Sequence, residues 1–124
     1  MRQYRFAALV AVFACCPAFA ADPVSYQEQG RCVAVLKISA ELFEVDGSIP
    51  ELTDSTKVLA KRMSDAFLFN TPYDRMAEAS DAEQAEEDRL VDMWNDATED
   101  AAQMSVLDYL ATQIQTCKAL LPPE

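Results

Sequence analysis

Apolar residues fill most of the segment 25–45. Plotted at 100° per residue, they cover an arc of roughly 240° and leave a narrow polar face with Lys37, Glu41 and Glu44. A helix with so wide an apolar surface needs neighbours on several sides, so we predict that it is the central helix. Gly47 should end it, because glycine accepts the left-handed conformation of a helix C-terminus. The apolar positions are Cys32, Val33, Val35, Leu36, Ile38, Ala40, Leu42, Phe43 and Val45.

A second helix is predicted to start at Thr53 or Asp54 as its N-cap and to run to about Phe69. Because it is polar on one side, only one stripe should be buried, and residues 48–53 should form the connecting loop. The stripe consists of Leu59, Met63, Ala66 and Phe67.

A third helix is predicted to begin at Pro72, with Thr71 as its cap. It should continue to about Asn95, and the spacing of Ser80 and Glu83 resembles a capping box, which indicates a possible interruption there. Whether this segment forms one helix or two is left open.

The last predicted helix, over about 98–120, has apolar residues at steps of three and four, which is typical of a core-facing seam. Joining it to the third helix would give a rod too long for a chain of this size, so we expect a break between Asn95 and Asp100. The seam consists of Leu107, Leu110, Ile114, Cys117 and Leu121.

The N-terminal segment has the features of a cleaved signal peptide, residues 1–20. Two arginines precede a short apolar run, and Ala18 and Ala20 supply the small residues that a signal peptidase recognises. The run is shorter than the roughly 20 apolar residues of a membrane-spanning helix. A lipoprotein site at Cys15 is disfavoured, because the large Phe13 lies close before it. We therefore expect cleavage after Ala20, export to the periplasm or the exterior, and one helical domain over residues 21–124.

Two cysteines, Cys32 and Cys117, remain in residues 21–124. An even number of cysteines in an exported chain favours a disulfide over a reactive or metal-binding thiol. Bridging these two positions makes the first and last helices neighbours. The predicted fold is therefore all-α, a small up-down bundle of about four helices whose first and last members are tied by one disulfide.

The same residues carry 21 acidic and eight basic side chains, a net charge of −13. Such a chain repels nucleic acid and anionic lipid head groups, and it favours basic protein partners or simple solubility. We expect no nucleic-acid binding and no membrane association once the signal peptide is removed.

The chain has no histidine, no glycine-rich phosphate loop and no haem-attachment motif. With both cysteines oxidised, thiol nucleophiles and zinc clusters are also disfavoured. These features predict a protein that is not an enzyme and needs no cofactor or metal. An enzyme built on this chain would have to use carboxylates alone, as some glycosidases do.

The segment 78–100 holds ten acidic residues and one basic residue, Arg89. It is interpreted either as a solvated helix face or as a surface that binds a basic partner. A calcium loop is disfavoured because residues 81–92 contain no glycine. Trp94 is either a core residue or an exposed anchor of that surface. The candidate partner-binding residues are Glu83, Glu86, Glu87, Asp92 and Trp94.

Three functions are compatible with these features. The favoured one is an exported, non-enzymatic binding protein that docks a basic protein, as immunity proteins and enzyme inhibitors do. The alternative is a periplasmic stress or chaperone-like factor that exposes apolar surface in acid. A glycosidase that uses only carboxylates is a remote third hypothesis, because a small bundle seldom offers a cleft for a sugar.

Overall fold

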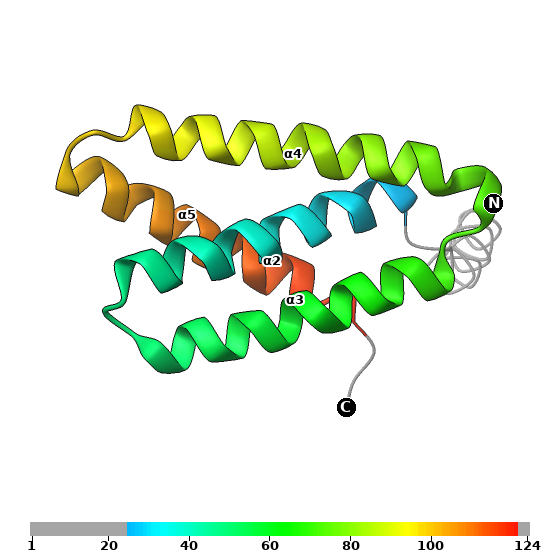
Figure 1. The fold of residues 1–124 in the computed structure, drawn as a ribbon, viewed down its shortest axis with the longest axis horizontal. Helices are drawn as coiled ribbons and strands as arrows, with labels where there is room; N and C mark the ends of the chain where they lie inside the picture. The colour runs from blue at the N-terminus through cyan, green and yellow to red at the C-terminus, as the bar shows by residue number, and fades with distance from the viewer. Residues whose placement is uncertain (1–24, 122–124) are drawn as a thin grey trace, which may run out of the picture.

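The computed structural model describes residues 25–121, which form α2 (Tyr26–Asp46), α3 (Pro50–Asn70), α4 (Met76–Asp96) and α5 (Asp100–Lys118). A short 3-10 turn, η1 (Tyr73–Arg75), precedes α4. Successive helices run in opposite directions, and α2 lies between α3 and α4 with α5 behind it (Figure 1). The predicted all-α bundle is confirmed. The predicted signal peptide, with Ala18 and Ala20, lies outside the described residues.

Helix α2 is the central helix, as its wide apolar arc predicts. The Ser25 hydroxyl caps its first turn by accepting a hydrogen bond from the Glu28 amide, at 3.4 Å. Gly47 ends it in the left-handed conformation at φ 69°. Val45 is the exception to the predicted buried arc: it is 76% exposed, because it lies in the last turn, beside the link to α3. The buried residues are Gly30, Cys32, Val33, Ala34, Val35, Leu36, Ile38, Ser39, Ala40 and Phe43.

Helix α3 begins one turn earlier than its sequence pattern predicts. Pro50 occupies the first helical position, where its missing N–H costs no hydrogen bond and its fixed φ suits the helix. Thr53 is therefore not the N-cap but lies inside the first turn, where its hydroxyl donates to the Ile49 carbonyl at 3.4 Å. The link between α2 and α3 is short as a result, and it holds the two helices antiparallel.

The start of α4 also differs from the prediction. Thr71 does not cap α4 but ends α3, where its amide donates to the Phe67 carbonyl at 3.1 Å. Pro72 leads into the η1 turn, and α4 then continues without a break to Asp96. The capping-box spacing at Ser80 therefore lies within one continuous helix, and that side chain is exposed. The expected break before Asp100 is confirmed by the short α4–α5 link.

The predicted disulfide is confirmed. Cys32 in the second turn of α2 is bonded to Cys117 in the last turn of α5, across 85 positions of sequence, and neither residue is accessible to solvent. The bond lies where α5 returns against α2, and three more residues of the predicted α5 seam are buried in the same core as the two cysteines. These are Leu107, Leu110 and Ile114.

Gly30 marks a close approach between α2 and α4. A Cβ atom added to it would lie 2.1 Å from the Ala79 carbonyl oxygen and 3.2 Å from the Glu83 amide nitrogen, both backbone atoms of α4. Ala34, one turn further along α2, and Ala79 are fully buried. Small residues thus let the two helix backbones meet, and this fixes which side of α4 faces the core.

Candidate functional site

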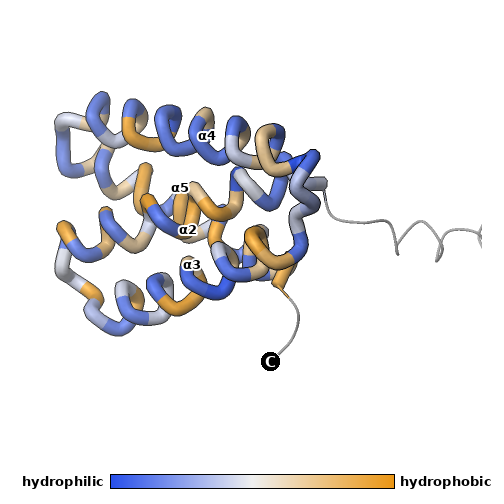
Figure 2. Tube along the Cα trace, turned by 45° about the vertical axis from the view of Figure 1, so that its right-hand side comes forward, coloured by the Kyte–Doolittle hydropathy of each residue, from blue (hydrophilic) through white to orange (hydrophobic). Residues whose placement is uncertain are grey.

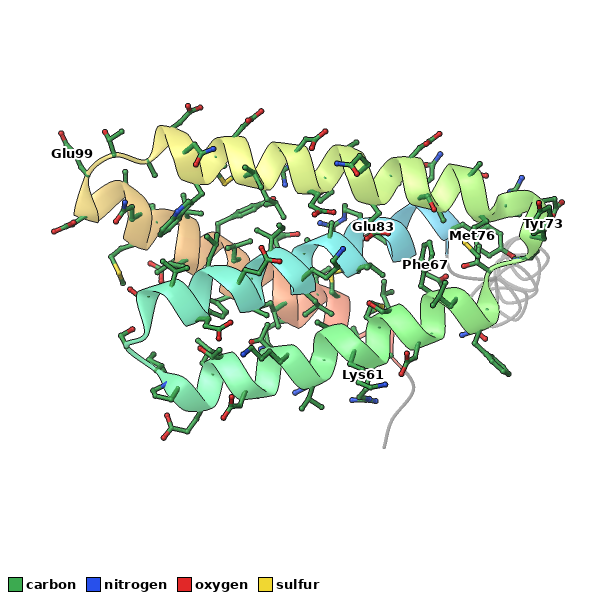
Figure 3. All side chains as sticks on the ribbon, in the orientation of Figure 1. Lys61, Phe67, Tyr73, Met76, Glu83 and Glu99 are labelled. Atoms are coloured by element: carbon green, nitrogen blue, oxygen red, sulfur yellow. A yellow bond between two sulfur atoms is a disulfide. The ribbon has the colours of Figure 1, made fainter. Side chains whose placement is uncertain are left out.

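Two of the candidate carboxylates on α4 turn inward toward α2. Lys37 of α2 lies with its Nζ 3.2 Å from Glu83 Oε1 and 3.8 Å from Glu87 Oε2. The hydrogen bond to Glu83 is the main cause of a raised pKa at Lys37, opposed by partial burial and supported by the charge of Glu87. Figure 3 shows Glu83 between the two helices. Both carboxylates are therefore paired with the same lysine within the molecule.

Glu86 is the centre of a charged network that joins three helices. Its side chain is only 8% exposed, and it accepts a hydrogen bond from Arg89 Nε at 2.6 Å. Arg31 Nη1 of α2 lies 3.7 Å from its other oxygen. Both guanidiniums also form hydrogen bonds to α5. Arg89 donates to the Tyr109 hydroxyl at 2.8 Å, and Arg31 donates to the Gln113 side-chain oxygen at 3.0 Å. Glu86 thus stabilises the packing of α2, α4 and α5.

Arg31 also holds Glu28, one turn earlier on α2. Its Nη2 donates to Glu28 Oε1 at 2.7 Å, and its Nε lies 3.1 Å from both oxygens of the same carboxylate. This hydrogen bonding lowers the pKa of Glu28, although partial burial acts in the opposite direction. The guanidinium is therefore shared between a partly buried pair with Glu28 and the buried carboxylate of Glu86.

The lowered pKa of Glu28 predicts a pH-dependent contribution to stability. A carboxyl whose pKa is lower in the folded state stabilises the fold above its unfolded pKa, about 4.3, and this contribution is lost as the pH falls through the folded value. We expect Glu28→Gln to reduce the loss of unfolding free energy between about pH 5 and pH 2 in urea titrations. Glu51→Gln, at the exposed start of α3, is the matched control. Equal acid sensitivity in the two variants would contradict this prediction.

The opposite, solvent-facing side of α4 carries a different set of carboxylates. Asp81, Asp88 and Asp92 are all exposed, and their spacing of seven and four residues places them in one row. Gln84 donates to Asp88 at 2.9 Å. Within residues 25–121, no lysine or arginine nitrogen pairs with any of the three. We call Asp81, Asp88 and Asp92 the outer row. Hydrophilic residues dominate α4 as a whole, as Figure 2 shows.

The structure therefore divides the five candidate partner-binding residues. Asp92 is exposed in the outer row, whereas Glu83, Glu86 and Glu87 face the other helices. Trp94 is half-buried and packs against the core. Asp81 and Asp88 were not among the candidates. The separation of seven residues between them is visible in the sequence and places them on the same face of a helix. The sequence does not show that this face points to solvent, because that depends on which side of α4 meets α2. Partner binding by the five residues stays a prediction.

A shallow groove lies between the N-terminal half of α2 and α4, beside the outer row. Its volume is about 740 Å³, and charged side chains of both signs line it. Within the described residues, no three or more Asp, Glu or Cys side chains are grouped to hold a metal ion. No helix of the described part is long and apolar enough to cross a membrane. The charged lining consists of Glu28, Arg31, Glu78, Asp81, Glu86 and Arg89.

Comparison of the chain with protein-family models, curated proteins and solved structures found no match. The function must therefore be argued from the surface itself. The outer row is the exposed part of the predicted acidic segment that lies along the length of α4, and Asp96, Glu99 and Asp100 are also exposed at its C-terminal end.

Proposed function

We propose that the protein is an exported, non-enzymatic binding protein that docks a basic protein through the outer row of α4. The observation that carries this proposal is the exposure of Asp81, Asp88 and Asp92 on one helix face, where no lysine or arginine among residues 25–121 pairs with them. Three aspartates in one row attract lysine and arginine side chains. Because these aspartates lie on the surface, a partner can bind them without disturbing the core of the bundle.

The network beneath the row supports this assignment. The carboxylates on the inner side of α4 are already paired with Arg31, Lys37 and Arg89, so the outer ones are the carboxylates along α4 that are available to a partner's basic groups. Those same ion pairs fix α4 against α2 and α5. A preorganised row loses little conformational entropy on binding. The net charge of −13 on residues 21–124 adds long-range attraction, which raises the association rate of a basic partner.

The Cys32–Cys117 disulfide supports a place outside the cytoplasm, where disulfides form and persist. An exported acidic protein of this kind is suited to neutralise a basic enzyme or toxin by covering its positively charged surface. We therefore assign the protein to the immunity or inhibitor type.

The outer row is tested by charge reversal. The full chain, expressed with its own N-terminal segment and purified in oxidised form, is immobilised, and basic proteins captured from its host and neighbouring cells are eluted with salt. For a partner so isolated, Asp81→Lys/Asp88→Lys/Asp92→Lys should weaken binding at least about tenfold, mainly by slowing association, and should reduce its salt dependence.

A triple variant of equal charge provides the control. Asp54→Lys/Asp65→Lys/Asp74→Lys changes exposed positions on α3 and η1, away from the outer face of α4. It should retain most of the affinity, because the net charge alone acts only at long range. Equal losses in both triple variants, or binding that salt does not weaken, would show that the outer row is not the docking surface.

A further inference from the structure

A second, apolar groove lies at the end of the bundle away from the disulfide. It is formed by the α2–α3 link and the first half of α5, and its volume is about 130 Å³. Phe43 and Leu107 lie at its buried base, and Leu52 is partly buried beside them. Ile49 and Met104, which also line it, are 52% and 54% exposed. A cavity of about 150 Å³ holds benzene, so this somewhat smaller groove has room for one aliphatic side chain.

The surroundings of this groove are uniformly acidic. The chain segments 42–56 and 92–108, which form this end of the bundle, contain nine aspartates and glutamates and no lysine or arginine. Asp46 and Asp108 are exposed and line the groove itself. Figure 3 shows Glu99, in the α4–α5 link, at the same end of the bundle. Lys57, the first cation of α3, pairs with Glu44 at 3.2 Å.

We infer that this groove binds one apolar side chain of a basic protein, flanked by lysine or arginine residues that pair with Asp46 and Asp108. Charge complementarity selects this occupant, because an apolar base beside carboxylates suits a hydrophobic residue with cationic neighbours. A second copy of the chain would bring its own strong negative charge. The inference rests on the proposed function for the class of partner, and it adds the apolar anchor that the outer row lacks.

The groove is tested with a defined probe, a capped peptide with one leucine between two pairs of lysines. Methyl NMR of the oxidised full chain should show shifts at Ile49 and Met104 as the peptide is added. A peptide with alanine in place of leucine should bind at least about tenfold more weakly, and a peptide with glutamates in place of lysines should not bind. Equal binding of the leucine and alanine peptides, or shifts confined to other residues, would overturn the inference.

Substitutions in the groove locate the site. Ala111 lines the groove and is exposed, so Ala111→Trp should fill it and abolish peptide binding. Ala102→Trp is the matched control, because Ala102 is exposed on α5 and does not line the groove. Asp46→Lys/Asp108→Lys should also weaken binding at least about tenfold. Sizing of the free protein checks for a second copy: concentration-dependent dimers that Ala111→Trp abolishes would overturn the inference.

The two proposals fail in different ways. If Ala111→Trp leaves capture of the natural partner unchanged while charge reversal of the outer row abolishes it, the proposed function stands and this inference is wrong. If the peptide binds in the groove but reversal of the outer row leaves partner binding intact, the groove is supported and the proposed docking row is wrong. Loss of partner binding in both variants, but not in their controls, supports both.

Discussion

Reduction of the Cys32–Cys117 disulfide is expected to lower the free energy of unfolding by about 4 kcal/mol, the largest effect that we predict. The bond closes a loop across 85 positions, and restricting so long a loop removes much of the unfolded state's conformational entropy. A domain of this size has a stability of roughly 5–15 kcal/mol, so the reduced protein should retain only a small margin. Urea unfolding of oxidised and reduced protein, followed by circular dichroism, measures the difference.

Comparing chemical reduction with replacement of both cysteines separates the effect of the crosslink on the unfolded chain from the effect of core packing. Both cysteines are fully buried, so Cys32→Ala/Cys117→Ala removes core atoms as well as the crosslink, whereas chemical reduction leaves the sulfur atoms in place. The double variant should therefore be the less stable of the two. A loss below about 1 kcal/mol on reduction would show that residual structure already restricts the reduced, unfolded chain and that the crosslink adds little.

The features that were predicted correctly from sequence are mostly local. The apolar arc of α2, the glycine at its end and the seam of α5 each depend on residues a few positions apart. The disulfide followed from a count of two cysteines. The errors lie at helix starts, where two local signals compete. Pro50 and Thr53 can both begin a helix, and in the structure the helix begins at Pro50, whose fixed φ suits the first helical position.

The candidate site was harder to predict, because the direction in which a helix faces depends on partners distant in sequence. Glu83 and Glu87 share a face by their spacing, but only the position of Lys37 on α2 shows that this face is turned inward. Glu86 likewise lies in a network with Arg31, 55 positions earlier by residue number. A run of acidic residues therefore predicts the charge of α4, but it does not reveal which carboxylates remain available to a partner.

Gly30→Ala is expected to destabilise the protein by about 2–3 kcal/mol, although alanine is the better helix former by about 1 kcal/mol. The added methyl group would lie 2.1 Å from the Ala79 carbonyl oxygen. That atom belongs to the α4 backbone, so no rotation of a side chain relieves the overlap and the two helices must separate. Urea unfolding measures the loss, and amide NMR should show the largest shifts along α4 near Ala79 and Glu83.

Two substitutions separate this steric effect from the general cost of replacing a residue. Gln84→Ala, on the exposed side of α4, changes helix propensity and removes only one exposed hydrogen bond to Asp88, so it should be nearly neutral. A Cβ at Gly47 would make only an ordinary contact, 3.8 Å from the Glu44 carbonyl oxygen, but it requires a positive φ, so Gly47→Ala should cost about 1 kcal/mol without shifting the signals of α4. If Gly30→Ala is instead as stable as the wild type, α2 and α4 can move apart at no cost. The rigid support that we assign to the outer row would then be absent, because separation of these helices at Gly30 also draws Lys37 and Arg31 away from the inner carboxylates.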